Sequence, residues 1–529
     1  MISRRVSCAL LAALAMGASH AGAVSNFGAQ QSMDSHAEKF TQQLKTQPQS
    51  PAGGFQLISE VDLCDYGNCD TCKVNADCPV DETCQMRSGM KFCRRRPLFP
   101  EFDWKDGLAT IASFFGAALA AGGGLGGGGL FVPIFILVVG LKTEEAIPLS
   151  QAMIFGGSIA NLILNAGVSH PDDPARSVID FQTLLVLQPT MLIGTILGVF
   201  FHVMSPHWFL LLLLAITLSY SVYKTYQRAV KAWNEENAAR YGVNPSQMSR
   251  ESSRLDLLEE ESIESASLIA PSDEDLKLYE GVKQREQSSK WPIFFVVLLW
   301  TVVAAFTLVR GGHPIRPSLA GVVICSATFW VLTLIQIPLL GGFVYVPAKT
   351  LGEDYAIKVR LGRDKERGQI QWTKFHLWAF PFLSLAAGIL GGMLGLGGGM
   401  FMGPILLQLG MLPQVAAATS ATTVLISSSA AALNFYVIGM LLEDYAGWYM
   451  AIGFIATIFG STLVSYLIKK YNRTSIIIIV IVVLIAIATL LLLVVGGIQL
   501  SKDLKTGEHL AFTGYCPNRP APTGAPAGK

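Results

Sequence analysis

Two runs of glycine are the residues of this sequence best suited to hold a small ligand. They occupy equivalent places in two similar patterns, Leu125-Gly126-Gly127-Gly128 before Phe131 and Pro133, and Leu396-Gly397-Gly398-Gly399 before Met402 and Pro404. Each glycine costs a helix about 1 kcal/mol relative to alanine, so a run of them favours a break in the helix. The N–H groups freed at a break, and the positive N-terminus of the next helix, attract an anion.

Polar side chains begin the helix that follows each run. We therefore predict one substrate site built from both copies: Gly126, Gly127, Gly128, Ser150, Gln151, Gly397, Gly398, Gly399, Thr419, Ser420 and Thr422. Its positive charge would come from backbone dipoles, because a lysine or arginine buried in lipid is costly and would hold an anion too tightly. The alternative is that the glycines only allow helices to pack closely.

The first run also fits the G-x-G-x-x-G pattern of dinucleotide-binding loops, from Gly124 to Gly129. That interpretation fails, because no strand precedes the run and a long apolar segment surrounds it. The sequence also contains no G-x-x-x-x-G-K-[ST] loop, no H-E-x-x-H helix and no G-x-S-x-G elbow. We expect neither enzymatic activity nor a bound cofactor or metal.

The composition places the glycine runs in a lipid bilayer. Of 529 residues, 51% are hydrophobic and 15% are charged, whereas soluble domains have about 25% charged residues. The stretch Ile476–Ile498 contains no charge and is long enough to cross a hydrocarbon core of about 30 Å. The formal net charge of +1 gives no indication of a nucleic-acid partner. We predict a multi-pass protein of the endomembrane system or the plasma membrane.

The N-terminus has the features of a secretory signal peptide over residues 1–23, with Ala21-Gly22-Ala23 as the cleavage site. Residues 24–105 are then luminal or extracellular. This segment contains the cysteines Cys64, Cys69, Cys72, Cys78, Cys84 and Cys93. Such a cluster behind a signal peptide indicates a disulfide-rich module, in which fifteen connectivities are possible. A redox pair or a zinc site is the alternative. Cys516, near the C-terminus, has no evident partner within the chain.

The rest of the chain alternates between apolar blocks and polar connections. We predict a first transmembrane repeat at 107–229, an acidic cytosolic linker at 230–290, a central transmembrane pair at 291–339, a basic cytosolic loop at 340–375, a second transmembrane repeat at 376–498 and a disordered tail at 499–529. The predicted fold class is an all-α polytopic membrane protein. Its two halves are related as repeats of four segments each, and each half contains a Gly-broken helix.

The distribution of basic residues indicates how the Gly-containing segments 107–140 and 377–410 enter the membrane. If each is a re-entrant hairpin, the chain crosses eight times, and the basic loop and Lys469–Arg473 both lie in the cytosol. If each crosses once, there are ten crossings and the same clusters lie outside, against the positive-inside rule. The first arrangement is favoured, and it makes the two halves an inverted repeat.

The two glycine patterns, each at the head of four apolar segments, resemble the sulfite exporter TauE/SafE family. The resemblance covers residues 107–229 and 377–498. It implies a secondary transporter of a small anion such as sulfite, a sulfonate or another organic anion. The signal peptide, the Cys-rich module and the linker depart from compact bacterial members and suit a eukaryotic member.

A membrane scaffold or receptor is the alternative function, with the Cys-rich module and the cytosolic loops as protein-binding surfaces. The linker offers two motifs for cytosolic partners. Glu264–Ile269 has the form of an acidic dileucine sorting signal, and Ser272 precedes three acidic residues, as at acidophilic kinase sites.

The linker is expected to face the cytosol. An epitope inserted beside Ser252 should then bind antibody only after the membrane is permeabilised. Staining of intact cells that carry the protein in the plasma membrane would instead support ten crossings and remove the inverted repeat.

Overall fold

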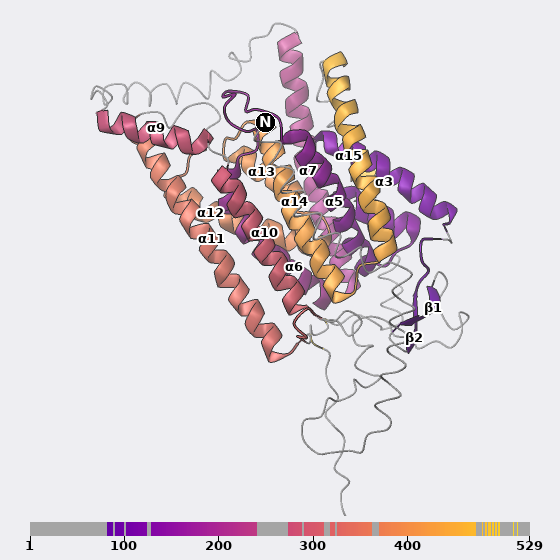
Figure 1. The fold of residues 1–529 in the computed structure, drawn as a ribbon. Coiled ribbons are helices and arrows are strands. Elements are labelled where there is room, and N and C mark those ends of the chain that lie inside the picture. Colours follow the sequence, from indigo (N-terminus) through magenta and orange to yellow (C-terminus); the bar gives the residue numbers. More distant parts are fainter. Residues whose placement is uncertain are drawn as a thin grey trace, which may run out of the picture. The chain divides into compact units, whose positions relative to one another are not determined.

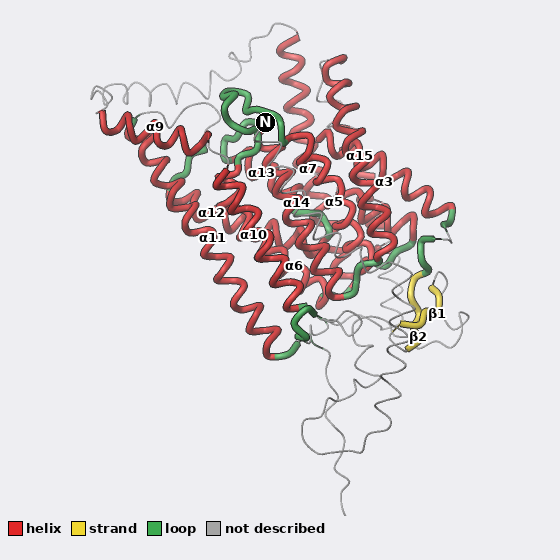
Figure 2. Tube along the Cα trace, viewed as in Figure 1, coloured by secondary structure: helices red, strands yellow, loops and turns green. Residues whose placement is uncertain are grey.

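The computed structural model describes residues 82–87, 90–99, 102–123, 128–240, 273–287, 290–311, 318–322, 325–361 and 370–471, with separate positions between 479 and 516. Helices dominate this part of the chain, and Figure 2 shows the short strands β1 and β2 in yellow. The predicted signal peptide and most of the predicted linker lie outside the described residues.

The strands β1 (Glu82–Arg87) and β2 (Met90–Arg95) form a two-stranded sheet within the predicted Cys-rich module. Residues 84–93 belong to a compact unit separate from the helices. Cys84, on β1, is disulfide-bonded. Cys64, Cys69, Cys72 and Cys78 lie outside the described residues, and so does the side chain of Cys93. The module as a whole therefore stays a prediction.

The helices, shown in Figure 1, follow one another without further strands in the described residues. They are α3 (Trp104–Gly123), α4 (Gly128–Ile134), the π-helix η3 (Phe135–Val139), α5 (Thr143–Asn165), α6 (Phe181–Met204), α7 (His207–Arg240), α9 (Asp273–Gln287), α10 (Lys290–Arg310), α11 (Ala327–Arg360), α12 (Lys374–Leu394), α13 (Gly399–Gln408), α14 (Pro413–Ile438) and α15 (Glu443–Tyr471).

Eight of these helices are long and apolar enough to cross a membrane: α5, α6, α7, α10, α11, α12, α14 and α15. This number equals the predicted number of crossings, but the two sets differ. The structural set includes α12, which was predicted as part of a re-entrant segment. The predicted last crossing, 475–498, is described only at separate positions, which are helical.

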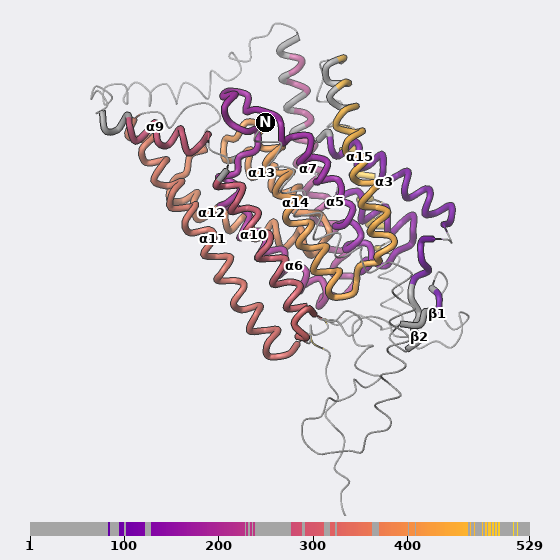
Figure 3. The backbone as a smooth tube through the Cα atoms, in the orientation of Figure 1, coloured from indigo at the N-terminus to yellow at the C-terminus, as the bar shows by residue number. Residues whose placement is uncertain are grey.

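Helices from opposite ends of the chain pack against each other through glycines. Figure 3 shows the orange and yellow α14 and α15 beside the purple α5 and α3, and α6 packs along α12. A Cβ atom at Gly388 of α12 would collide with the carbonyl oxygen of Met191 on α6, and one at Gly156 of α5 would collide with that of Met450 on α15. Small residues allow such close approach of helix backbones in membranes.

The residues that flank each Gly-containing segment lie close together. At the first segment, Arg95 Nη2 donates to the carbonyl oxygen of Val139 at 2.7 Å, so the chain before α3 meets the end of η3. At the second segment, Trp372 before α12 and Met411 after α13 line one cavity. Each segment therefore ends near the place where it begins.

Helices continue into two segments that the sequence predicts as polar connections. Part of the basic loop predicted at 340–375 is helical, because α11 continues through Lys349 and Lys358 to Arg360. Within the linker predicted at 230–290, α7 continues to Arg240 and α9 forms a separate helix. Basic and acidic residues interrupt the apolar pattern without interrupting a helix, so hydropathy alone does not predict where these helices end.

The two Gly-containing segments are built alike, from helices of unequal length. The first consists of α3, with 20 residues, followed by α4 and η3, and the second of α12, with 21 residues, followed by α13, with 10. A full-length helix is therefore followed by a shorter one in each copy.

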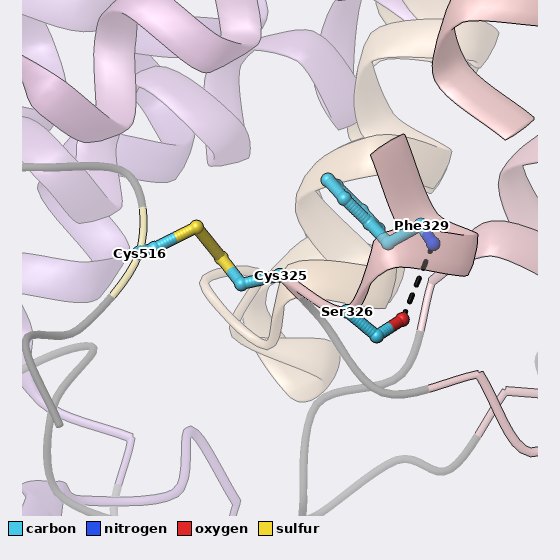
Figure 4. Close-up of a disulfide and its surroundings, with 4 residues drawn as sticks. All are labelled: Cys325, Ser326, Phe329 and Cys516. Carbon is cyan, nitrogen blue, oxygen red and sulfur yellow. Dashed lines mark hydrogen bonds between the residues drawn. A yellow bond between two sulfur atoms is a disulfide. The ribbon is translucent and has the colours of Figure 1, made fainter. Parts of the chain in front are cut away.

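Cys516 is paired within the chain, contrary to the expectation from the sequence. It forms a disulfide with Cys325, which lies just before α11 (Figure 4). The next residue, Ser326, accepts a hydrogen bond from the Phe329 N–H and so caps α11. The two cysteines are 191 positions apart, and no local pattern in the sequence connects them.

Replacing Gly388 by alanine should destabilise the protein by about 1–3 kcal/mol or more, because the new methyl group meets the backbone of α6. The matched control is Gly341→Ala on α11, where nothing lies within 4 Å of the new Cβ. That change should be neutral or stabilise by up to about 1 kcal/mol. Thermal unfolding in detergent measures both. Equal melting temperatures would contradict the close packing of α6 on α12.

Candidate functional site

The second glycine run forms a break between α12 and α13. Gly395, Gly397 and Gly398 have φ angles of +72°, +68° and +66°, which side-chain-bearing residues rarely adopt. Side chains at Gly397 and Gly398 would contact Ile154 and Met191 respectively. Both of these residues lie near the middle of their helices, α5 and α6. The N-terminus of α13 is therefore in the middle of the bundle.

Side chains of α5 and α14 donate hydrogen bonds to the carbonyl oxygens at this break. The bonds are Ser150 Oγ to Gly395 at 2.7 Å, Gln151 Nε2 to Gly391 at 2.6 Å, Ser427 Oγ to Gly397 at 3.1 Å and Ser420 Oγ to Gly399 at 3.3 Å. In lipid, each carbonyl left without a donor would cost several kcal/mol. The polar starts of α5 and α14 thus stabilise the broken helix.

The start of the first copy reaches the same place. Gly126 and Gly127 lie outside the described residues, whereas Gly128 begins α4. A Cβ atom at Gly128 would lie 2.6 Å from the carbonyl oxygen of Leu396. The two glycine patterns are therefore in contact, and close packing accounts for the glycine at this position.

Thr419 and Thr422 make their hydrogen bonds elsewhere. Thr419 Oγ1 accepts from the Asp180 N–H at 3.0 Å, which connects the start of α14 to the residue before α6. Thr422 Oγ1 donates to the Ala418 carbonyl of its own helix at 3.0 Å. Of the predicted polar residues, Ser150, Gln151 and Ser420 bond to the break and these two threonines do not.

Unused hydrogen-bonding groups remain near the break. The N–H groups of Gly397 and Gly398 bond to no acceptor among the described residues. Near the break, Gln151 Oε1 and both side-chain amide atoms of Gln188 are also buried, and they have no hydrogen-bond partner among the described residues. Gln188 lies one turn from Met191 on α6. Sequence reasoning missed this glutamine, although a polar residue within an apolar segment was a signal for it.

Arg310, at the end of α10, is a second residue that sequence reasoning missed. Its side chain is only 3% exposed. Nη2 donates to Asn434 Oδ1 at 2.9 Å, and Nη1 lies 3.3 Å from Gln336 Oε1 and 3.4 Å from Thr333 Oγ1. The guanidinium also packs on the rings of Phe200 and Phe329. A cation is therefore held between α10, α11 and α14 by neutral acceptors and aromatic rings.

A cavity lies where α9 meets the ends of other helices, and we call it the α9 cavity. It has a volume of about 60 Å³, several times the roughly 10–15 Å³ that one water molecule needs. Its lining includes His170, Arg176, Asp180, Lys358 and Met411. Burial, and secondly the charge of Arg176, lowers the pKa of His170. His170 Nδ1 also accepts a hydrogen bond from the Asp172 N–H, which fits a neutral ring at neutral pH.

Comparison with known families decides what kind of protein carries this site. The family model described as "Sulfite exporter TauE/SafE" matches residues 109–320 and again 278–491. The chain belongs to the sulfite exporter TauE/SafE family. The matched residues extend beyond the two stretches that carried the resemblance in the sequence, and they include all of α10 and α11.

Known members of this family align with most of the chain. Sulfite exporter TauE/SafE family protein 2 of Arabidopsis thaliana is 32% identical over 418 residues, which cover 77% of this chain and 87% of that protein. Family protein 1 of the same plant is 31% identical over 416 residues, covering 77% and 88%. No solved structure gave a significant match. With eight helices among its described residues that are long and apolar enough to cross a membrane, this member of an exporter family is an integral, multi-pass membrane transporter.

Arg310→Lys should destabilise this TauE/SafE member by about 2–4 kcal/mol. Lysine keeps the charge but lacks the planar guanidinium with which arginine reaches three acceptors. Each lost hydrogen bond to a charged group is worth about 1.5–3 kcal/mol. Arg360→Lys, at the exposed end of α11, is the control and should leave the melting temperature unchanged. If both variants unfold at the same temperature, Arg310 does not hold these helices together.

Proposed function

We propose that the protein is a secondary transporter that moves a small anion, such as sulfite, a sulfonate or another organic anion, past the N-terminus of α13. One observation carries the proposal: a helix begins in the middle of the bundle, at glycines whose N–H groups have no acceptor among the described residues. Such an N-terminus attracts negative charge. Broken helices in corresponding positions of two halves commonly mark a transporter's substrate site.

The proposed halves are inverted relative to each other. The first Gly-containing segment begins and ends near Arg95 and Val139. The second begins and ends at the α9 cavity, which also contains Asp180, the residue before α6. His202, at the opposite end of α6, lies beside Phe435 near the end of α14. These contacts support re-entrant segments that enter from opposite faces, with the linker and the α9 cavity on the cytosolic side.

The proposed ligand shell keeps the residues expected from the sequence but divides their roles. Gly126–Gly128, Gly397 and Gly398 are proposed to supply backbone N–H groups, whereas the Gly399 N–H donates to the carbonyl oxygen of Gly397 and Gly399 only allows the close approach. Ser150, Gln151 and Ser420 hold the carbonyl oxygens of the break through their own hydrogen bonds, so that donors and not acceptors face the anion. Thr419 and Thr422, on α14, border the path that the anion is proposed to follow. Gln188 is added as an amide donor.

Arg310 favours an anion over a cation in this path. Its partner Asn434 lies seven residues beyond Ser427 on α14, or about 10 Å along the helix. The charge is thus too far from Gly397 to bind the anion directly, but in a medium of low dielectric it still attracts one. Neutral donors at the break itself allow release.

Transport requires the break to open. A Cβ atom at Gly391 of α12 would lie 2.6 Å from the backbone nitrogen of Gly398. The start of α13 is therefore covered by α12, and an anion can reach it only when the two helices separate.

Uptake into proteoliposomes, measured over a panel of sulfite, sulfate, sulfonates and carboxylates, tests the proposal. The wild-type protein should transport sulfite or a sulfonate. Gln188→Leu should reduce apparent affinity about tenfold. The same change should leave stability equal or higher, because it removes a buried amide without a partner, which costs about 1–3 kcal/mol.

Gln414→Leu, at an exposed position in the first turn of α14, is the matched control and should transport as the wild type does. The proposal is wrong if the wild-type protein moves no anion of the panel. Unchanged transport by Gln188→Leu would remove this residue from the shell.

A further inference from the structure

One carboxylate occupies the α9 cavity between two basic side chains. Glu286 of α9 forms ion pairs with Arg176 at 3.3 Å and with Lys358 of α11 at 2.5 Å. The side chain of Glu286 is 15% exposed, and that of Lys358 is 12% exposed. Two cations that flank a carboxylate in a partly buried place can bind a free oxyanion by the same charge-assisted hydrogen bonds.

The remaining acidic groups of the cavity already have other partners. Asp180 accepts from the Gln182 and Thr183 N–H groups and so caps α6. Asp354 pairs with Arg285 at 2.5 Å. Without Glu286, the cavity would therefore hold two basic side chains beside acidic groups that are engaged elsewhere.

The helix that carries Glu286 is attached by polar and apolar contacts. Besides the two ion pairs of Glu286, they include the Arg285–Asp354 pair, a hydrogen bond from Gln287 Nε2 to Asp173 Oδ2 at 3.3 Å and the fully buried side chain of Val282. Figure 1 shows α9 across the end of α11. Displacement of Glu286 therefore concerns its side chain, while Val282 keeps α9 in place.

We propose that Arg176 and Lys358 form a binding site for a small oxyanion in the α9 cavity, and that Glu286 occupies this site as a tethered competitor that the free anion displaces. The site is distinct from the break, because it lies at the Met411 end of α13 and not at its N-terminus. It goes beyond the proposed transport and does not depend on it.

Tethering makes Glu286 an effective competitor. A group on a docked helix has a local concentration in the millimolar range, so a free oxyanion must exceed a comparable concentration to replace it. Removing the negative charge of Glu286 should therefore tighten anion binding, whereas removing Lys358 should weaken it. If the three residues only fastened α9, neither variant would change anion binding.

The test is calorimetric titration of the purified full-length protein with sulfite and, separately, with sulfate. Glu286→Gln should bind at least fivefold more tightly than the wild type. Lys358→Met should bind at least tenfold more weakly. Glu280→Gln, at an exposed position of the same helix, is the matched control and should leave binding unchanged. Binding that is unaffected or weakened in folded Glu286→Gln would overturn the proposal.

Flux separates the two proposals. Variants that shift binding as expected in a protein that transports no anion would refute only the transport function. Transport with binding unaffected by Glu286→Gln would refute only the competitor.

Discussion

A helix that breaks inside a bilayer leaves carbonyl oxygens and N–H groups that the lipid cannot satisfy, and this constraint governs the architecture around α12 and α13. The carbonyl oxygens of Gly391, Gly395, Gly397 and Gly399 accept hydrogen bonds from side chains of α5 and α14. Those two helices come from different halves of the chain, so the break is stable only when both halves are assembled. The N–H groups of Gly397 and Gly398, which bond to no acceptor among the described residues, are the donors of the proposed anion site.

Close packing of glycines gives the assembly its geometry. Because Gly388 and Gly156 allow α6 to touch α12 and α5 to touch α15, backbone contacts hold each half against the other at these places. Small residues at such interfaces also leave few interlocking side chains to disengage when helices move. The contact of Gly391 with Gly398 is the place where that movement would have to begin.

The sequence was informative about local pattern and less so about long-range partners. The glycine runs, the apolar segments and the family resemblance could all be recognised in the sequence, because each depends on residues close together in the chain. The hydrogen bonds of Ser150 and Ser420 to the break could not be predicted, since a hydroxyl group that could bind an anion can equally donate to a carbonyl oxygen. The Cys325–Cys516 disulfide and the burial of Arg310 depend on residues far apart in sequence. No periodicity or spacing of residues predicts them.

The central claim is that the N-terminus of α13 is an anion site in the middle of the membrane. Selenite has the charge and shape of sulfite and scatters X-rays anomalously, so crystals of the protein soaked with selenite would test the claim directly. An anomalous peak should appear beside Gly397 and Gly398, between α6 and α14. A peak confined to the surface, or none within the bundle at saturating selenite, would contradict it.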